Sequence, residues 1–335
     1  MSEEKHPTRI AIFNHKGGVG KTTLTVNIAA AVASLGKRVL IVDSDPQCNV
    51  TAYLIEESVV DDMLDKSDSP EGQTLWSAVK PISEGEGKVK TVQTFKIGES
   101  LQLLAGDVRL IEFEQDLGNF WGECYQRKVR GFRGIAALSL LIEQISNEHD
   151  IDYVFYDSGP NIGALNRVII LDCDYVIIPI ACDLFSLRAI RTLGRTLSGW
   201  IRDWQIIASI APEGVEILSG MPKLLGYIPQ RFRIYRGHPS AEYAKAFPQI
   251  EKRIQTDVVA RLKEIDPSLV PFEPSELKLG EVKDFGSLAA ASQAQGLPIG
   301  DADAGTDGQR WDAKQTFMEI AKTIIERTST KGTGK

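Results

Sequence analysis

The sequence predicts an α/β fold, in which a doubly wound, mainly parallel sheet carries helices on both faces. A glycine-rich turn at residues 16–20 follows an apolar strand and opens a helix. Two further apolar runs, residues 37–43 and 151–157, each end in an aspartate. The carboxyl ends of parallel strands meet at one edge of such a sheet, where ligands bind. These observations predict one large domain over residues 1–328, with its site at that edge.

The composition is that of an ordinary globular protein. The chain has 335 residues, 43% hydrophobic and 25% charged, which is enough for one large α/β domain. No apolar run approaches the length of a membrane span, and the N-terminus lacks the shape of a signal peptide. We therefore expect a cytoplasmic protein with no membrane partner. The net charge of −7 excludes a generally basic nucleic-acid binder, so any DNA contact must come from a local patch.

The first strand, residues 10–13, and the first helix, residues 24–33, enclose a turn suited to phosphate. Backbone N–H groups and the positive end of the helix dipole point at one spot there. The ordinary P-loop pattern fails at its first glycine, where His15 stands, and a second lysine, Lys16, precedes Lys21 by five residues. The chemistry of the motif places Lys21 on the β- and γ-phosphates and the hydroxyl of the next residue, Thr22, on Mg²⁺.

This loop resembles the deviant Walker A box of the ParA/MinD family of P-loop ATPases. In that family two protomers close over two ATP molecules, and the first lysine reaches the nucleotide of the partner. The resemblance therefore implies that Lys16 acts in trans in a homodimer. The alternative is a structural glycine-rich turn with two surface lysines. The nucleotide-binding residues that the resemblance implies here are Lys16, Gly17, Gly18, Val19, Gly20, Lys21, Thr22 and Thr23.

The next strand and its turn supply two carboxylates. Gly36 is placed to end the first helix, and the strand at residues 37–43 leads into Asp43-Ser44-Asp45-Pro46-Gln47-Cys48-Asn49. This segment resembles the family's Asp-x-Asp-Pro-Gln-x-Asn switch. By that match Asp45 orients the attacking water, and Asp43 supports Mg²⁺ through water. A purely structural turn rich in Asp, Pro and Asn is the alternative.

The middle of the chain carries less chemistry. Residues 56–98 are acidic and poorly periodic, which predicts a mobile connection with one short helix near residues 75–79. A strand over 101–106 and a helix over 134–147 follow. Aromatic and basic residues interleave over 118–133, which favours a surface helix anchored in the core over a nucleic-acid contact.

The strand at residues 151–157 has the Walker B arrangement, in which Asp157 holds the Mg²⁺ shell. Ser158-Gly159-Pro160-Asn161 resembles the family's second switch, which usually reads Asp-x-Pro-Pro from the aspartate onward. Gly159 replaces the first proline, and we expect a more flexible switch.

A buried strand over 175–180 leads to a helix that we expect to begin with Ser186 as N-cap and to run to about Asp203. Its arginines fall on one narrow face, and no acidic residue lies between Asp183 and Asp203. The stripe can bind DNA phosphates or an acidic partner, or it can be a solvated face. Arg231, Arg233 and Arg236 form a second basic cluster. The stripe consists of Arg188, Arg191, Arg195 and Arg202.

The C-terminal part completes the expected domain. A strand over 223–230 ends at Gln230, where relatives often place an amide near the adenine, and an enlarged helical region covers about 231–276. Residues 279–299 resemble the family's final loop and helix, but Glu281-Val282 replace the usual Pro-Arg. Lys283 is the basic candidate that remains in this loop. The last helix spans 311–327, and residues 329–335 form a disordered tail.

These observations predict a ParA-like ATPase with ATP and Mg²⁺ as cofactors. It forms a dimer around ATP, binds DNA non-specifically and is switched off when a ParB-like or other activating partner stimulates slow hydrolysis. The expected role is partition or positioning of DNA or other cargo. One alternative is an ATP-dependent regulatory or assembly dimer that recruits a protein without DNA. The other is an iron–sulfur electron-transfer ATPase that uses Cys124 and Cys173.

Overall fold

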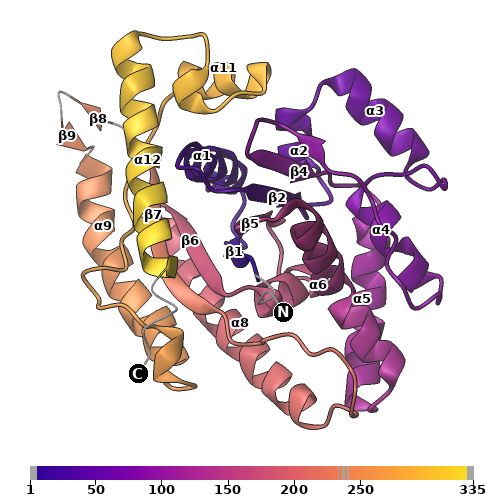
Figure 1. Ribbon diagram of the computed structural model, residues 1–335. Helices are drawn as coiled ribbons and strands as arrows, with labels where there is room; N and C mark the ends of the chain where they lie inside the picture. Colours follow the sequence, from indigo (N-terminus) through magenta and orange to yellow (C-terminus); the bar gives the residue numbers. More distant parts are fainter. Residues whose placement is uncertain (1–5, 233, 236–237, 240, 330–335) are drawn as a thin grey trace.

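The computed structural model describes residues 6–232, 234–235, 238–239 and 241–329, with an eight-stranded sheet at the centre (Figure 1). The strand order is β10-β7-β6-β1-β5-β2-β4-β3, and every neighbouring pair is parallel except β3 with β4. The predicted fold class is therefore confirmed. The strands are β1 Thr8–Ile12, β2 Val39–Asp43, β3 Phe95–Lys96, β4 Leu101–Leu104, β5 Tyr153–Asp157, β6 Tyr175–Ala181, β7 Lys223–Phe232 and β10 Val282–Lys283, with a separate ribbon of β8 Ile234–Tyr235 and β9 His238–Pro239.

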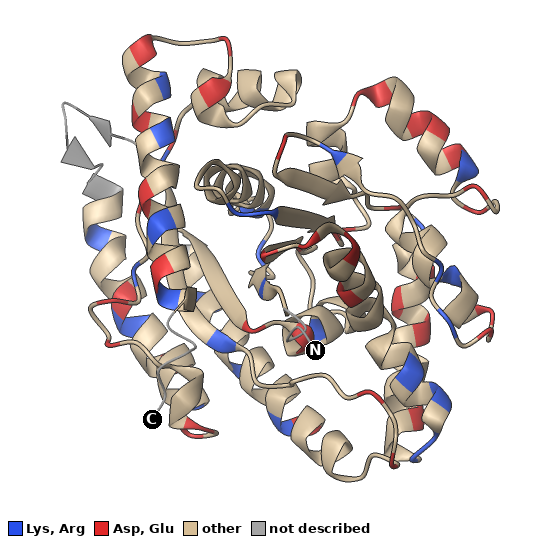
Figure 2. Cartoon of the chain, viewed as in Figure 1, with Lys and Arg blue, Asp and Glu red and all other residues tan. Residues whose placement is uncertain are grey.

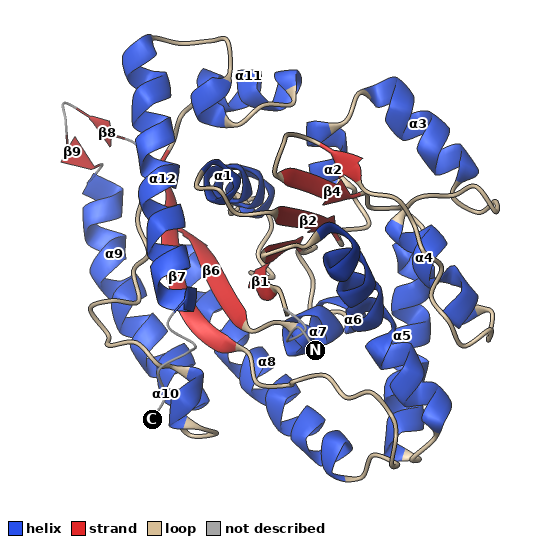
Figure 3. Cartoon of the chain, viewed as in Figure 1, coloured by secondary structure: helices blue, strands red, loops and turns tan. Residues whose placement is uncertain are grey.

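Helices cover both faces of the sheet (Figure 3). One apolar core lies under α1, α2, α11 and α12, and the other lies under α4 to α9. The helices are α1 Lys21–Ser34, α2 Asn49–Leu54, α3 Glu57–Lys66, α4 Leu75–Ser83, α5 Leu110–Tyr125, α6 Val129–His149, α7 Ala164–Asp172, α8 Leu184–Ser209, α9 Ala241–Arg253, α10 Ala260–Lys263, α11 Ser287–Gln295 and α12 Asp307–Ser329, with a π-helix at Ile254–Val259 and 3-10 turns at Pro267–Leu269 and Ile299–Asp301.

The central strand β1 shows why the sheet needs helices on both sides. Successive side chains of a strand point to opposite faces. Ile10 and Ile12 belong to the core under α1 and α12, whereas Ala11 and Phe13 belong to the core under α5 to α8. All four side chains are fully buried, so neither face of β1 can meet water.

Local sequence sets the ends of α1 and α8. Gly18 and Gly20 take positive φ angles of 69° and 74° in the turn before α1, and Gly36, with φ 81°, follows the end of that helix as expected. The expected N-cap of α8 is wrong by three residues. The carboxylate of Asp183 accepts the Ser186 backbone N–H at 2.9 Å, because an Asp reaches the open amides of the first turn. The helix also continues beyond Asp203 to Ser209.

The segment 56–98, expected to be a connection with one short helix, holds α3, α4 and β3. Val60 and Met63 on α3 pack with Ala105 in a small third core, so a few apolar residues are enough to order an acidic helix. Thr74 starts α4 through a capping box with Ser77. No helix in the described ranges is both long enough and apolar enough to cross a membrane. Ser329 ends α12, and the rest of the expected tail lies outside the described residues.

Candidate nucleotide-binding site

The glycine-rich loop joins β1 to α1 at the carboxyl edge of the sheet, as predicted. Asn14 anchors it, because its Nδ2 donates to the Pro179 carbonyl at 2.8 Å and its Oδ1 accepts the Lys16 backbone N–H at 3.0 Å. The ammonium of Lys21 is buried and donates to the Asn14 carbonyl at 3.0 Å. Burial lowers the pKa of Lys21, although Asp157 and Asp45 act in the opposite direction. A buried ammonium therefore lies under the loop.

Thr22 and Asp157 meet beside this loop. The Thr22 hydroxyl donates to Asp157 Oδ2 at 2.8 Å, and the Thr25 hydroxyl donates to Asp157 Oδ1 at 3.2 Å. Asp157 is buried, and this burial, with the neighbouring Asp43, raises its pKa to about 8. No cluster of three or more His, Cys, Asp or Glu side chains in the described part of the chain is arranged to hold a metal. One hydroxyl beside one carboxylate suits Mg²⁺, which keeps waters and takes further ligands from substrate phosphates.

Asp43 and Asp45 face different groups after β2. Asp43 is fully buried, and its Oδ2 accepts the backbone N–H and the hydroxyl of Thr51 at 2.8 and 2.6 Å. Burial raises the pKa of Asp43 to about 6. The Asp45 carboxylate accepts the Gln47 backbone N–H at 3.0 Å and Asn49 Nδ2 at 3.3 Å, both from its own turn. Asp43 thus fixes the start of α2, and its role toward Mg²⁺ stays a prediction.

A buried asparagine that sequence reasoning missed holds the loop after β5. Asn166 donates to the Gly159 carbonyl at 3.0 Å, to the Asn161 carbonyl at 3.0 Å and to Asn161 Oδ1 at 2.7 Å. A Cβ at Gly159 would lie 3.2 Å from Asp45 Oδ1, so this loop lies directly against the second carboxylate of the turn after β2. No sequence signal marks Asn166, because it is one of three polar residues in a mostly apolar helix, together with Arg167 and Asp172.

A hollow of about 270 Å³ lies beside the loop, where the base of a nucleotide was expected. Gln230 is buried there, and its Nε2 has no hydrogen-bond partner in the described part of the chain. A Cβ at Gly20 would lie 2.5 Å from Gln230 Oε1, so the amide reaches the loop only because residue 20 is glycine. Lys283 pairs with Asp312 at the rim. The hollow thus brings together four predicted residues, Gly20, Thr23, Gln230 and Lys283.

Lys16, expected to act in trans, is bound within its own chain. Its Nζ lies 2.5 Å from Asp183 Oδ2 and 3.1 Å from the Ser186 hydroxyl. Asp183 was not predicted as a site residue, and it is 167 positions away in the sequence.

The arginine stripe lies exposed along α8 (Figure 2). No acidic residue lies within the helix between Asp183 and Asp203, but other elements supply acidic partners to two members of the stripe. Arg191 lies 3.9 Å from Asp257 of the π-helix, and Arg202 lies 3.6 Å from Glu264. Arg188 and Arg195 have no ion pair with a described residue. The side chains of Arg231, Arg233 and Arg236, the second basic cluster, lie outside the described part.

The two cysteines of the iron–sulfur alternative are inaccessible. Cys124 and Cys173 are each 0% exposed, and burial raises the pKa of the Cys124 thiol to about 12. A cluster shared between subunits needs thiols at a surface. The burial of both thiols therefore argues against that alternative.

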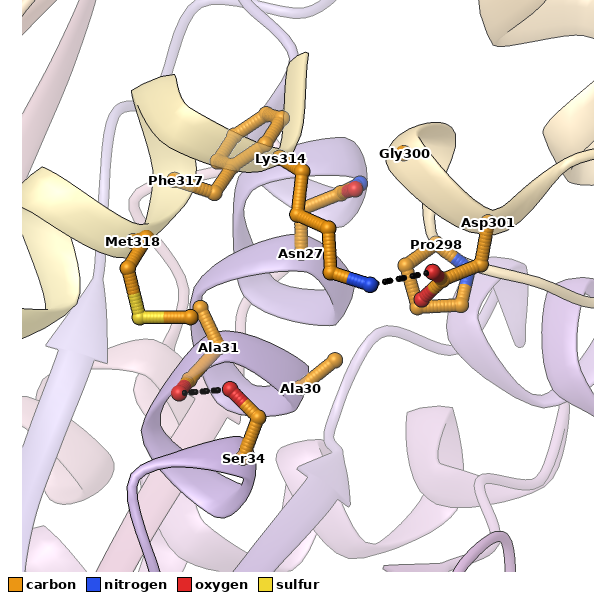
Figure 4. A pocket seen from close by; sticks show the side chains of 10 residues that line it. All are labelled: Asn27, Ala30, Ala31, Ser34, Pro298, Gly300, Asp301, Lys314, Phe317 and Met318. Carbon is orange, nitrogen blue, oxygen red and sulfur yellow. Dashed lines mark hydrogen bonds and ion pairs between the residues drawn. The ribbon is translucent and has the colours of Figure 1, made fainter. Parts of the chain in front are cut away.

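A second hollow lies between α1 and α12 (Figure 4). It measures about 80 Å³, and an ion pair of Lys314 with Asp301 at 3.0 Å closes one side. Its lining contains none of the predicted site residues.

Residues 8–205 match the AAA_31 family, described as an AAA domain. The sporulation initiation inhibitor Soj of Bacillus subtilis is 31% identical over 195 residues, which cover 56% of this chain and 64% of Soj. The chromosome partitioning protein ParA of Caulobacter vibrioides is 30% identical over 193 residues, 57% of this chain and 63% of that protein. The chain thus spans just under two thirds of these curated relatives.

Solved structures share the fold over nearly the whole chain. Protein DIP2308 of Corynebacterium diphtheriae has a TM-score of 0.71 at 23% identity, with 96% of this chain and 98% of that one covered. An ATP complex of a Cyanothece McdA variant has a TM-score of 0.64 at 17% identity, covering 96% and 97%. The pNOB8 ParA bound to nonspecific DNA has a TM-score of 0.59 at 18% identity, covering 97% and 100%.

The matched family segment begins at the first strand and includes the two-lysine loop, both switch segments and most of α8. The Caulobacter relative carries the name ParA, in agreement with the resemblance seen in the loop, and the solved structures share the fold. The chain belongs to the ParA/MinD family of P-loop ATPases.

Proposed function

We propose that this protein binds ATP with Mg²⁺, dimerises around the nucleotide and hydrolyses it slowly as a switch. The observation that carries the proposal is the different placement of the two lysines of one loop. Lys21 is buried beneath the loop, whereas the side chain of Lys16 is 23% exposed and its ammonium lies against Asp183 and Ser186 at the start of α8. One loop does not need two lysines for one triphosphate, so we assign the second lysine, which is not buried beneath the loop, to the nucleotide of another protomer.

The residues present fit the nucleotide and its metal. The Lys21 ammonium and the loop N–H groups neutralise phosphate charge, and Thr22 with Asp157 holds Mg²⁺. Bound Mg²⁺ supplies positive charge that offsets the charge developing on the phosphates. Asp45 orients the attacking water. The hollow beside Gln230 takes the base, whose polar edge would satisfy the unpartnered amide.

The role that fits best is partition or positioning of DNA or other cargo at the nucleoid. The name of the chromosome partitioning protein ParA of Caulobacter supports it, as does the pNOB8 ParA bound to nonspecific DNA. Dimers that carry ATP would hold DNA phosphates through Arg188 and Arg195, and an activating ParB-like protein would end each cycle by stimulating hydrolysis.

Light scattering tests the dimer. With Mg²⁺ and a non-hydrolysable ATP analogue, the wild-type mass is expected to double, while Lys16→Ala binds nucleotide but stays monomeric. Lys88→Ala, which removes an exposed lysine far from the loop, serves as the control and dimerises normally. A wild-type protein that stays monomeric with saturating nucleotide would contradict the proposal.

An ATP hydrolysis assay tests the catalytic roles. We expect Lys21→Ala and Asp45→Ala to lose at least about tenfold in ATP turnover.

A regulatory or assembly dimer without DNA is the second candidate. The ion pairs of Arg191 with Asp257 and of Arg202 with Glu264 favour it, because they remove half of the free charge of the stripe. An ATP-loaded Asp45→Ala dimer that ignores DNA even at low salt would support this candidate over partition.

A further inference from the structure

The ammonium group of Lys16 and the start of α8 meet at the edge of the site. Lys16 Nζ lies 2.5 Å from Asp183 Oδ2 and 3.1 Å from the Ser186 hydroxyl. The side chains of Lys16 and Asp183 are 23% and 44% exposed, so the pair lies at the surface. The backbone N–H of Lys16 is bound to Asn14 Oδ1, which turns the lysine toward α8.

Asp183 divides its two oxygens between two tasks. Oδ1 accepts the Ser186 backbone N–H at 2.9 Å and so caps α8, whereas Oδ2 takes the Lys16 ammonium. Burial alone acts to raise the pKa of Asp183, but Lys16 and the Ser186 amide outweigh burial and lower the pKa. The carboxylate is therefore ionised near neutral pH, and Lys16 has a charged partner before any second protomer arrives.

We propose that Asp183 is a positioning residue for Lys16, which it holds in cis until the lysine transfers to the nucleotide of a second copy of this chain. The inference rests on the proposed ATP-dependent dimer. A single ammonium cannot keep its short contact with Asp183 and also reach across an interface. Each protomer must therefore break one ion pair when the dimer forms, and Asp183 sets the protein concentration at which ATP assembles it.

Asp183→Asn tests this proposal without disturbing α8, because asparagine is an equally good N-cap. A partly exposed ion pair changes an equilibrium by a factor of about 2 to 5, and two pairs break per dimer. The dimer dissociation constant is therefore expected to fall roughly 4- to 25-fold in Asp183→Asn. Sedimentation velocity over a protein concentration series, with Mg²⁺ and a non-hydrolysable ATP analogue, measures it.

Asp203→Asn is the matched control, since it removes an exposed carboxylate from the same helix about 30 Å away. It is expected to dimerise as the wild type does. The difference in dimer dissociation constant between Asp183→Asn and the wild type is also expected to vanish at about 1 M salt, because surface ion pairs are screened there. A purely structural role of Asp183 as a cap would not produce this salt dependence.

The outcomes separate this proposal from the one on which it rests. If the wild type dimerises with nucleotide and Asp183→Asn dimerises equally or more weakly, the cis restraint is wrong while the dimer stands. If only Asp183→Asn dimerises, the restraint is supported in its strongest form. If neither protein dimerises at any nucleotide concentration, the ATP dimer is wrong and the restraint is wrong with it.

Discussion

Two buried carboxylates, Asp43 and Asp157, lie opposite each other in the register of β2 and β5. Burial and the neighbouring negative charge raise the pKa of Asp157 to about 8, and burial raises that of Asp43 to about 6. Without nucleotide, the pair resists losing both protons at neutral pH. A bound cation would relieve this cost.

The stability of the nucleotide-free protein is predicted to fall as pH rises from about 4 to about 8. The folded state binds the Asp157 proton up to a pKa of about 8, whereas an unfolded Asp releases it near 4, so the folded state loses stability across that window. Asp157→Asn keeps the acceptor for Thr22 and removes the titration. At pH 8.5 it is expected to be more stable than the wild type by about 1–3 kcal/mol, and equal near pH 4. Urea unfolding in the presence of EDTA measures the free energy of unfolding of the two proteins at both pH values.

Asp61→Asn, which removes an exposed carboxylate, controls for this experiment and is expected to match the wild type at every pH. A stability difference between Asp157→Asn and the wild type that does not change with pH would show that the titration of Asp157 is not its cause.

The arginine stripe of α8 is shaped by the helices that pack on it. A Cβ at Gly194 would lie 1.8 Å from the Asp257 carbonyl oxygen, so α8 meets the π-helix at a residue without a side chain. This close approach, together with the extra residue per turn of the π-helix, places the Asp257 carboxylate beside Arg191 and Arg253. The free charge of α8 is therefore concentrated at Arg188 and Arg195.

These two arginines are predicted to carry the contact with DNA phosphates. Arg188→Glu with Arg195→Glu is expected to weaken ATP-dependent DNA binding at least about tenfold. The slope of log affinity against log salt should fall by about 1 for each phosphate that the variant no longer binds. Fluorescence anisotropy on random duplex DNA over a salt series measures both quantities.

Arg202→Glu is the comparison within the same stripe, because Glu264 already neutralises Arg202. Its effect on DNA binding is expected to be clearly smaller than that of the double variant. Equal losses in the two variants would indicate a general charge effect rather than a defined contact.

At the scale of the whole molecule, one buried ion pair joins elements far apart in sequence. Arg9 of β1 contacts Asp172 of α7 at 2.7 Å and the Ser139 hydroxyl of α6 at 2.6 Å. The Tyr156 hydroxyl of β5 donates to the same Asp172 at 3.1 Å. This network lies on the central strands, away from the nucleotide site, and it fixes two helices against the sheet.

Removing one partner of the Arg9–Asp172 pair is predicted to destabilise the protein more than replacing both partners together. Asp172→Asn leaves a buried guanidinium without its counter-charge and is expected to lower the free energy of unfolding by about 3–5 kcal/mol. Arg9→Met with Asp172→Asn is expected to lose less than the sum of the two single variants. Asp62→Asn, which breaks an exposed pair with Lys66, should change stability by less than about 0.5 kcal/mol. Urea unfolding of the two single variants, the double variant and Asp62→Asn measures these changes in the free energy of unfolding. Strictly additive losses for Arg9→Met and Asp172→Asn would contradict an interaction between the two residues.

The sequence by itself determined the sheet, the two-lysine loop and the carboxylates at the ends of β2 and β5. These features depend on local pattern: buried strands are continuous apolar runs, and a glycine turn before a helix reads directly from neighbouring residues. The sequence also predicted that Gln230 and Lys283 lie near the nucleotide, but only through its resemblance to a family. The sequence analysis missed α3, because its acidic composition favoured a solvated connection although Val59, Val60, Met63 and Leu64 recur at helical spacing.

Only the tertiary structure decided which charges meet. The pairing of Lys16 with Asp183, of Arg191 with Asp257 and of Asn166 with the loop after β5 depends on strand order and on how closely helices cross. Periodicity tells which face of a helix is polar, but it carries no information on which residue of another element lies opposite. For that reason the sequence named the groups proposed to bind phosphate, and the fold alone showed which partners hold them.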